Sequence, residues 1–60
     1  MRKLHTFEQE LDANRFTAVL TVNQVEAQVL RGNDNQWDLW IIDEDALSQA
    51  RKLLGEYQSN

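Results

Sequence analysis

The segment from Trp37 to Ile42 limits the possible folds of this chain most strongly, because it is apolar on both sides when read as a strand. Leu39 and Ile41 would point to one face of that strand. Trp40 and Ile42 would point to the other face. A strand that is apolar on both faces is typical of the centre of a sheet. The segment therefore predicts a sheet with a neighbouring strand on each side of it.

A chain of 60 residues without cysteine has neither disulfides nor a zinc-thiolate site, so it must be stabilised by packing a core. Folding at this size buries about 60% of the surface of the unfolded chain, which disfavours a deep, substrate-enclosing pocket. The hydrophobic fraction of 42% is too high for a disordered chain, and the net charge of -4 makes nucleic acid a poor partner. We expect a single small cytosolic domain over residues 1–60, soluble when isolated.

The apolar runs in the sequence are short. The longest, Leu39 to Ile42, falls far below the roughly 20 residues that a membrane-spanning helix requires. Arg2 and Lys3, near the start, are not followed by the apolar run of a secretory signal. We therefore expect that this chain does not itself cross a bilayer.

A short strand is predicted near the start of the chain, from Lys3 to Phe7. Its alternation places Lys3, His5 and Phe7 on one side of the strand. Leu4 and Thr6 then lie on the other side.

Another strand is predicted directly before the central one. It begins at Val25 and ends near Leu30 or Arg31, with apolar and polar residues in alternation. The polar sequence from Gly32 to Asn35 stops it. Because Gly and Asn tolerate positive φ and Asp side chains bond to nearby backbone, this sequence predicts a hairpin loop.

The first of two predicted helices lies between the first two strands. It runs from about Glu8 or Asp12 to Gln24, where apolar residues recur at helical spacing. Its β-branched residues leave a buried strand from Phe16 to Val22 as an alternative.

The second helix follows the central strand. Asp43 to Asp45 are acidic, which suits a helix start, and the helix runs to about Tyr57. Its apolar residues recur at helical spacing and predict a buried stripe, which consists of Ala46, Leu47, Ala50, Leu53, Leu54 and Tyr57.

The predicted order is strand, helix, strand, strand, helix. A helical crossover makes the first two strands parallel, and the hairpin makes the third antiparallel to the second. With the third strand in the middle, this is an α+β fold whose three-stranded mixed sheet has the order 1-3-2, half of a ferredoxin-like unit. Two helices cover only one face, so Leu30, Trp40 and Ile42 would form an exposed apolar patch, the candidate interface.

Residues that could carry chemistry are few and scattered. His5 is the only histidine, and neither Ser48 nor Ser59 stands in a nucleophile motif. The acidic run lacks the spacing of a Ca²⁺ or Mg²⁺ loop and fits a helix start better. Trp37 and Trp40 point to opposite faces, so one is expected to pack in the core or a loop and the other can anchor an interface. We therefore predict no catalytic, cofactor or metal site, and no feature favours an enzyme.

The segment from Trp37 to Asp45, followed by Ala50 to Tyr57, resembles the end of the N-terminal cytosolic domain of GlpG-type rhomboid intramembrane proteases. In that family, a strand that ends in a Trp-aliphatic-x-Asp-Glu stretch leads into a terminal helix with an aromatic residue near its end. The resemblance extends from about Leu4 to Asn60 and includes the first helix at Phe16 to Gln24.

The resemblance implies a non-catalytic domain of a serine protease whose Ser-His dyad lies in the membrane-embedded part of the same parent chain. It also implies a location at the cytoplasmic face of the bacterial inner membrane. The implied role is to regulate, position or oligomerise the protease part, to which the hydrolase activity would belong.

A free-standing small protein-interaction or signalling module is the alternative. Such a module would bury the face that carries Trp40 and Ile42 against a protein partner. Self-association by strand exchange at the sheet edges is compatible with both hypotheses.

Overall fold

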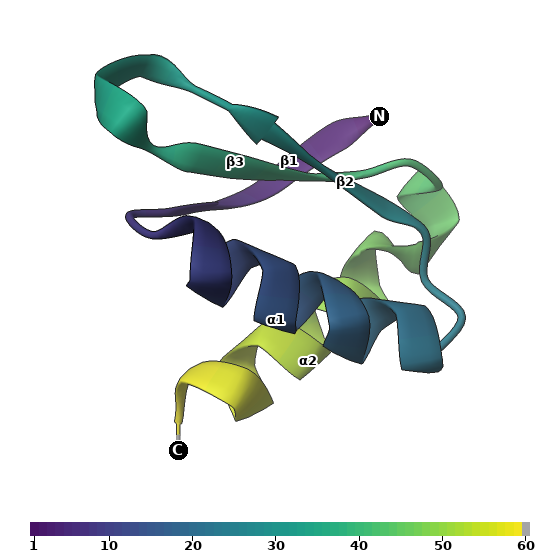
Figure 1. Cartoon of the computed structure of the whole chain (residues 1–60). Coiled ribbons are helices and arrows are strands. Elements are labelled where there is room, and N and C mark those ends of the chain that lie inside the picture. Colours follow the sequence, from purple (N-terminus) through teal and green to yellow (C-terminus); the bar gives the residue numbers. More distant parts are fainter. Residues whose placement is uncertain (60) are drawn as a thin grey trace.

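Three strands and two α-helices form in the predicted order in the computed structural model, which describes residues 1–59 (Figure 1). Asn60, which the resemblance includes, lies outside the described residues. The elements are β1 (Arg2–Phe7), α1 (Glu10–Val22), β2 (Ala27–Arg31), β3 (Trp37–Ile41) and α2 (Leu47–Gln58). Two single-turn 3-10 helices, Asn33–Asn35 and Glu44–Ala46, precede β3 and α2.

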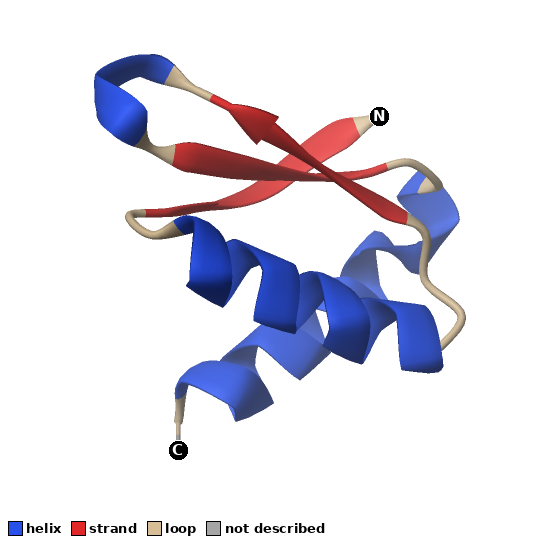
Figure 2. Cartoon of the chain, in the orientation of Figure 1, coloured by secondary structure: helices blue, strands red, loops and turns tan. Residues whose placement is uncertain are grey.

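The sheet has the order β1-β3-β2, so the doubly apolar segment is its central strand, as predicted. Both hydrogen-bonded pairs, β1 with β3 and β2 with β3, are antiparallel, so the sheet is antiparallel and not mixed as predicted. β1 and β2 run in the same direction on either side of β3 and do not pair with each other. Both helices lie on one face of the sheet (Figure 2), which confirms the predicted α+β fold.

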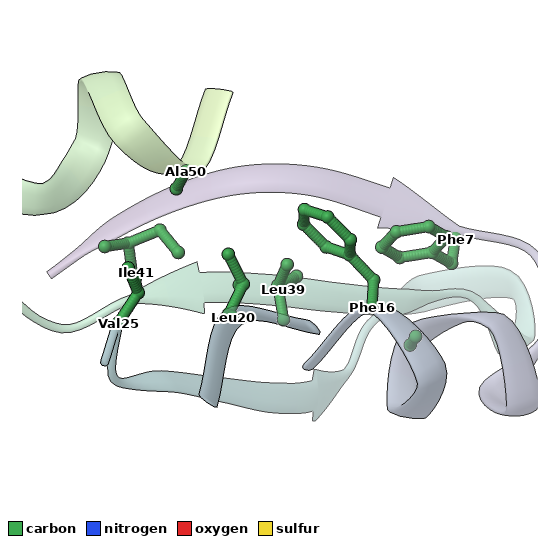
Figure 3. Packing of buried hydrophobic residues seen from close by; sticks show 8 residues of the cluster. Phe7, Phe16, Leu20, Val25, Leu39, Ile41 and Ala50 are labelled. Carbon is green, nitrogen blue, oxygen red and sulfur yellow. The ribbon is translucent and has the colours of Figure 1, made fainter. Parts of the chain in front are cut away.

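The core lies between the sheet and the helices (Figure 3). Leu39 and Ile41 of β3 are fully buried, as are Phe16 and Leu20 of α1. The buried apolar residues are Phe7, Ala13, Phe16, Leu20, Val25, Leu39, Ile41 and Ala50. Burial of one large apolar side chain stabilises a fold by about 1.5–3 kcal/mol. Because these side chains form the core between the sheet and the helices, the helix-covered face contributes most of the favourable packing energy.

α1 is a helix along its whole length, so the alternative of a strand from Phe16 to Val22 is wrong. Phe16 and Leu20, which are one helical turn apart, are both fully buried. Thr17 and Thr21 donate their hydroxyls to the carbonyl oxygens four residues earlier, at 2.8 and 2.9 Å. Burial of the apolar stripe thus outweighs the strand preference of the β-branched residues.

The end of α1 lies at Val22, before the predicted Gln24, because the chain reverses there. Gln24 has a positive φ of 63°. Its N–H donates to the carbonyl oxygen of Thr21 at 3.0 Å, and the N–H of Val25 donates to that of Leu20 at 2.9 Å. These two bonds define a Schellman motif, in which the position held by Gln24 is most often glycine.

A bulge in β1 makes the predicted alternation wrong at the start of the strand. Lys3 pairs with Trp40 and His5 pairs with Leu39, so the register shifts at Leu4 between them. Lys3 therefore lies on the opposite face from His5, and Leu4 packs against the core.

The hairpin loop forms where it is predicted, but its glycine serves a different purpose. Positive φ angles of 59° and 60° occur at Asp34 and Asn35, whereas Gly32 has a φ of -95°. A β-carbon on Gly32 would lie 2.8 Å from a carboxylate oxygen of Asp38. Glycine thus fits at this position without a shift of the Asp38 carboxylate.

The acidic run forms a separate 3-10 turn instead of the start of the helix, and α2 begins after it at Leu47, without a side-chain cap at Ala46. The carboxylate of Asp43 accepts a hydrogen bond of 3.0 Å from the backbone N–H of Asp45 and caps the turn before the helix. Ala50 is fully buried, and the ring of Tyr57 lies 5.3 Å from that of Phe16 between centroids. The other predicted stripe residues are half-buried against the core, and they are Ala46, Leu47, Leu53 and Leu54.

Candidate partner-binding face

One face of the sheet is covered by no helix or strand of residues 1–59, because α1 and α2 both lie on the other face (Figure 2). We name it the open face. Strand register assigns six residues to it, namely Lys3, Thr6, Gln28, Leu30, Asp38 and Trp40. Two of the three predicted interface residues, Leu30 and Trp40, therefore lie on the open face.

Trp40 lies at the centre of the open face. Its partners are Lys3 on β1 and Gln28 on β2. The Trp40 side chain is half-buried, and Leu30, diagonal to it on β2, is 38% exposed. A residue diagonally opposite on a neighbouring strand is within reach of an aromatic side chain. Trp40 and Leu30 thus form the apolar part of the open face.

Ile42 lies at the end of the sheet and not beside Leu30. It follows the last residue of β3, is 45% exposed, and donates its N–H to the carbonyl oxygen of Glu26 at 3.2 Å. Its register position is about 13 Å along the strands from that of Leu30. Ile42 also borders an open depression at the α1–β2 connection, whose other lining residues are Thr21, Gln24, Val25, Glu26 and Ala27. The three predicted interface residues therefore follow one another along the sheet, with Trp40 in the middle.

Trp37 lies on the helix-covered face, as the alternation predicts. It is half-buried against the core. The guanidinium carbon of Arg31 lies 5.9 Å from its ring centroid, at a distance typical of a cation–π contact. Trp40 is therefore the tryptophan that a partner on the open face would meet.

A polar contact on the open face was missed by the sequence reasoning. The hydroxyl of Thr6 donates to Oδ1 of Asp38 at 2.8 Å and joins β1 to β3. Both residues are half-buried. Alternation along β3 does place Asp38 opposite the core, but its partner depends on the strand register, which no local pattern specifies. Asp38 also lies beside Gly32, so the hairpin and the first strand meet at this carboxylate.

The residues considered for chemistry lie away from the open face. His5 is on the helix-covered face, where its Nε2 lies 3.3 Å from Nε2 of Gln58 and its ring packs edge-on to Phe7 at 4.7 Å. Ser48 is exposed on α2, and the hydroxyl of Ser59 donates to the carbonyl oxygen of Glu56 at 3.0 Å. Within residues 1–59, no three or more His, Cys, Asp or Glu side chains group in a way that could hold a metal ion. The open face itself offers an indole, a leucine, one amine and hydrogen-bonding groups, which suit a contact surface.

Neither helix of the described residues combines the length and the apolar character needed to cross a membrane. Comparison of the chain with protein-family models, curated proteins and solved structures found no significant match.

Proposed function

We propose that this chain is the non-catalytic N-terminal cytosolic domain of a GlpG-type rhomboid intramembrane serine protease. The proposal is supported by where the two segments that resemble that family lie in the fold. Trp37 to Asp45 includes the central strand and the capped turn after it, and Ala50 to Tyr57 forms most of α2. A central strand that leads through an acidic cap into a terminal helix is the arrangement that the resemblance implies.

In this proposal, the domain lies at the cytoplasmic face of the bacterial inner membrane and regulates, positions or oligomerises the membrane-embedded protease part. Catalysis belongs to the Ser-His dyad of that part. The open face is the contact surface, because Trp40 and Leu30 combine there with the polar side chains of Lys3 and Gln28. Tryptophan surrounded by polar residues is a frequent anchor of protein interfaces.

The coding sequence after Asn60 provides the first test. The proposal requires a linker followed by several apolar segments of about 20 residues each, with a serine and a histidine among them. A reading frame that ends without such segments would contradict the proposal.

Deletion of residues 1–60 from the parent protease provides the second test. Cleavage of a membrane substrate in lipid vesicles should persist, with a changed rate or a changed dependence on enzyme concentration. Complete loss of activity in a correctly folded membrane part would contradict the non-catalytic assignment. An unchanged rate and concentration dependence would contradict a regulatory, positioning or oligomerising role.

A free-standing protein-interaction module is the second candidate, and it is favoured by the exposed apolar residues of the open face. Trp40→Ser should weaken self-association or partner binding in sedimentation experiments and leave the fold intact, since Trp40 does not pack against the core cluster. Val22→Ser is the matched control, because Val22 is an apolar residue that is 79% exposed on α1, away from the open face. Loss of the native circular dichroism spectrum in Trp40→Ser would show that Trp40 stabilises the sheet instead.

A further inference from the structure

The depression at the α1–β2 connection is formed by segments that are distant in the sequence. The end of α1, the connection to β2 and the end of β3 lie at the same end of the molecule (Figure 1). The depression has a volume of about 470 Å³, which is within the range of known ligand pockets. Because it is open to solvent, it can admit the end of an extended side chain from another molecule.

An apolar side chain and a carboxylate lie side by side in the depression. The N–H of Ile42 donates to the carbonyl oxygen of Glu26 at 3.2 Å and continues the ladder between β2 and β3 by one pair. Residues opposite each other in such a ladder share a face and have β-carbons about 4.5–5.5 Å apart. Ile42 is 45% exposed, and Glu26 is exposed as well. A ligand in the depression would therefore contact both side chains.

The electrostatic character of the depression is negative. Both ion pairs printed by the geometry of residues 1–59 are made by Glu44, so Glu26 has no cationic partner in this part of the chain. Thr21, which also lines the depression, belongs to the last turn of α1, and that turn contains no basic residue. The carboxyl end of a helix carries partial negative charge and favours a cation. The helix end and the carboxylate thus both attract positive charge to the same place.

We propose that the depression binds an arginine side chain of a partner protein. The guanidinium lies against the carboxylate of Glu26 and near the end of α1, and the alkyl stem packs on Ile42. Arginine is favoured over lysine because its planar guanidinium matches a carboxylate with two parallel hydrogen bonds and keeps further donors for nearby acceptors. The inference rests on this depression alone and does not depend on the proposed parent protease.

N-acetyl-arginine N-methylamide is the probe for this site, because it carries the side chain of a residue within a chain and has no charged termini. Its titration into the isotope-labelled chain should shift the backbone amide resonances of the lining residues in NMR spectra. The dissociation constant should be in the millimolar range, since a single exposed ion pair is weak. Shifts that are centred on another part of the chain would overturn the proposal.

N-acetyl-citrulline N-methylamide is the matched control probe, because it has the same stem and nearly the same shape as arginine but no charge. It should bind about fivefold more weakly, since it loses the attraction of both the carboxylate and the helix end. Equal affinity of the two probes would overturn the proposal.

Glu26→Gln removes the charge of the site and keeps the shape of the side chain. It should weaken binding of the arginine probe about threefold and leave binding of the citrulline probe unchanged. Glu10→Gln is the matched control, because Glu10 is an exposed acid in the first turn of α1, at the other end of that helix. Both variants replace exposed side chains and should keep the native circular dichroism spectrum. An arginine affinity that Glu26→Gln leaves unchanged, or that both variants reduce equally, would overturn the proposal.

Ile42→Ala tests the apolar half of the site. Because the alkyl stem is common to both probes, this variant should weaken the arginine and citrulline probes by the same factor, about twofold. Unchanged binding of both probes would overturn the placement of the stem on Ile42.

Discussion

Replacing Gln24 by glycine should stabilise the domain, because Gln24 reverses the chain at the end of α1 with a φ of 63°. Glycine is the usual residue at this position of a Schellman motif. The bond from the Gln24 N–H to the carbonyl oxygen of Thr21, at 3.0 Å, is a backbone bond that glycine retains. The Gln24 side chain is exposed, so its removal costs little packing.

The size of the effect follows from two opposing contributions. A residue with a β-carbon in the left-handed region costs about 1–2 kcal/mol, which glycine avoids. Glycine also raises the entropy of the unfolded chain, which offsets about 0.4–1 kcal/mol of that gain. The net stabilisation should be about 0.5–1 kcal/mol. Since a chain of 60 residues has an unfolding entropy of roughly 130 cal/mol/K, its Tm should rise by about 4–8 °C.

Thermal unfolding followed by far-UV circular dichroism measures this shift. Ala18→Gly is the matched control, because Ala18 is exposed within α1, where glycine costs about 1 kcal/mol. The Tm of the control should fall while that of Gln24→Gly rises. An unchanged or lower Tm for Gln24→Gly would mean that the backbone at this residue carries no strain that glycine can relieve.

Three further substitutions test the core, the hairpin and the capped turn before α2. Leu39→Ala should lower the free energy of unfolding by about 2–5 kcal/mol in urea denaturation, because Leu39 is fully buried in β3; a loss below about 1 kcal/mol would contradict this position. Gly32→Ala should lower the free energy of unfolding by about 1–3 kcal/mol, since its β-carbon would lie 2.8 Å from the Asp38 carboxylate. An equal loss in an Asp38→Ser background would exclude this clash as the cause. Asp43→Ala should lower the free energy of unfolding by about 1 kcal/mol, because it removes the bond to the Asp45 N–H. Asp43→Asn should retain most of that stability. Urea midpoints of both variants equal to that of the wild-type chain would show that the cap contributes nothing.

Much of the fold could be predicted because the periodic patterns are strong in β3 and α2. β3 has apolar residues on both of its faces, and such a strand is expected at the centre of a sheet. The strand order follows, because the other two strands must then lie on either side of β3. The helical stripe of α2 likewise specified its buried side. Trp40 and Leu30 of the candidate site were predictable for the same reason, since alternation assigns them opposite the core.

Other features depended on contacts between distant segments. The β-branched residues of α1 are compatible with a strand, and the burial of Phe16 and Leu20 against the sheet decides for a helix. Ile42 fits the alternation of the open face, but it lies beyond β3 and borders the depression at the α1–β2 connection. A local pattern contains neither effect, because each involves a packing partner elsewhere in the chain.

Residue types, their periods and their order along the chain were thus sufficient for the three strands, α2, the strand order and the identity of the open face, but not for α1. The register of β1 was not available from them. It sets the faces taken by Lys3 and Leu4, and it brings Thr6 to Asp38, 32 residues away in the sequence. Local periodicity reports whether a residue is buried or exposed, whereas register is selected by the pairing and packing energies of whole strands. The bulge in β1 and the regular register of β2 are therefore properties of the assembled sheet.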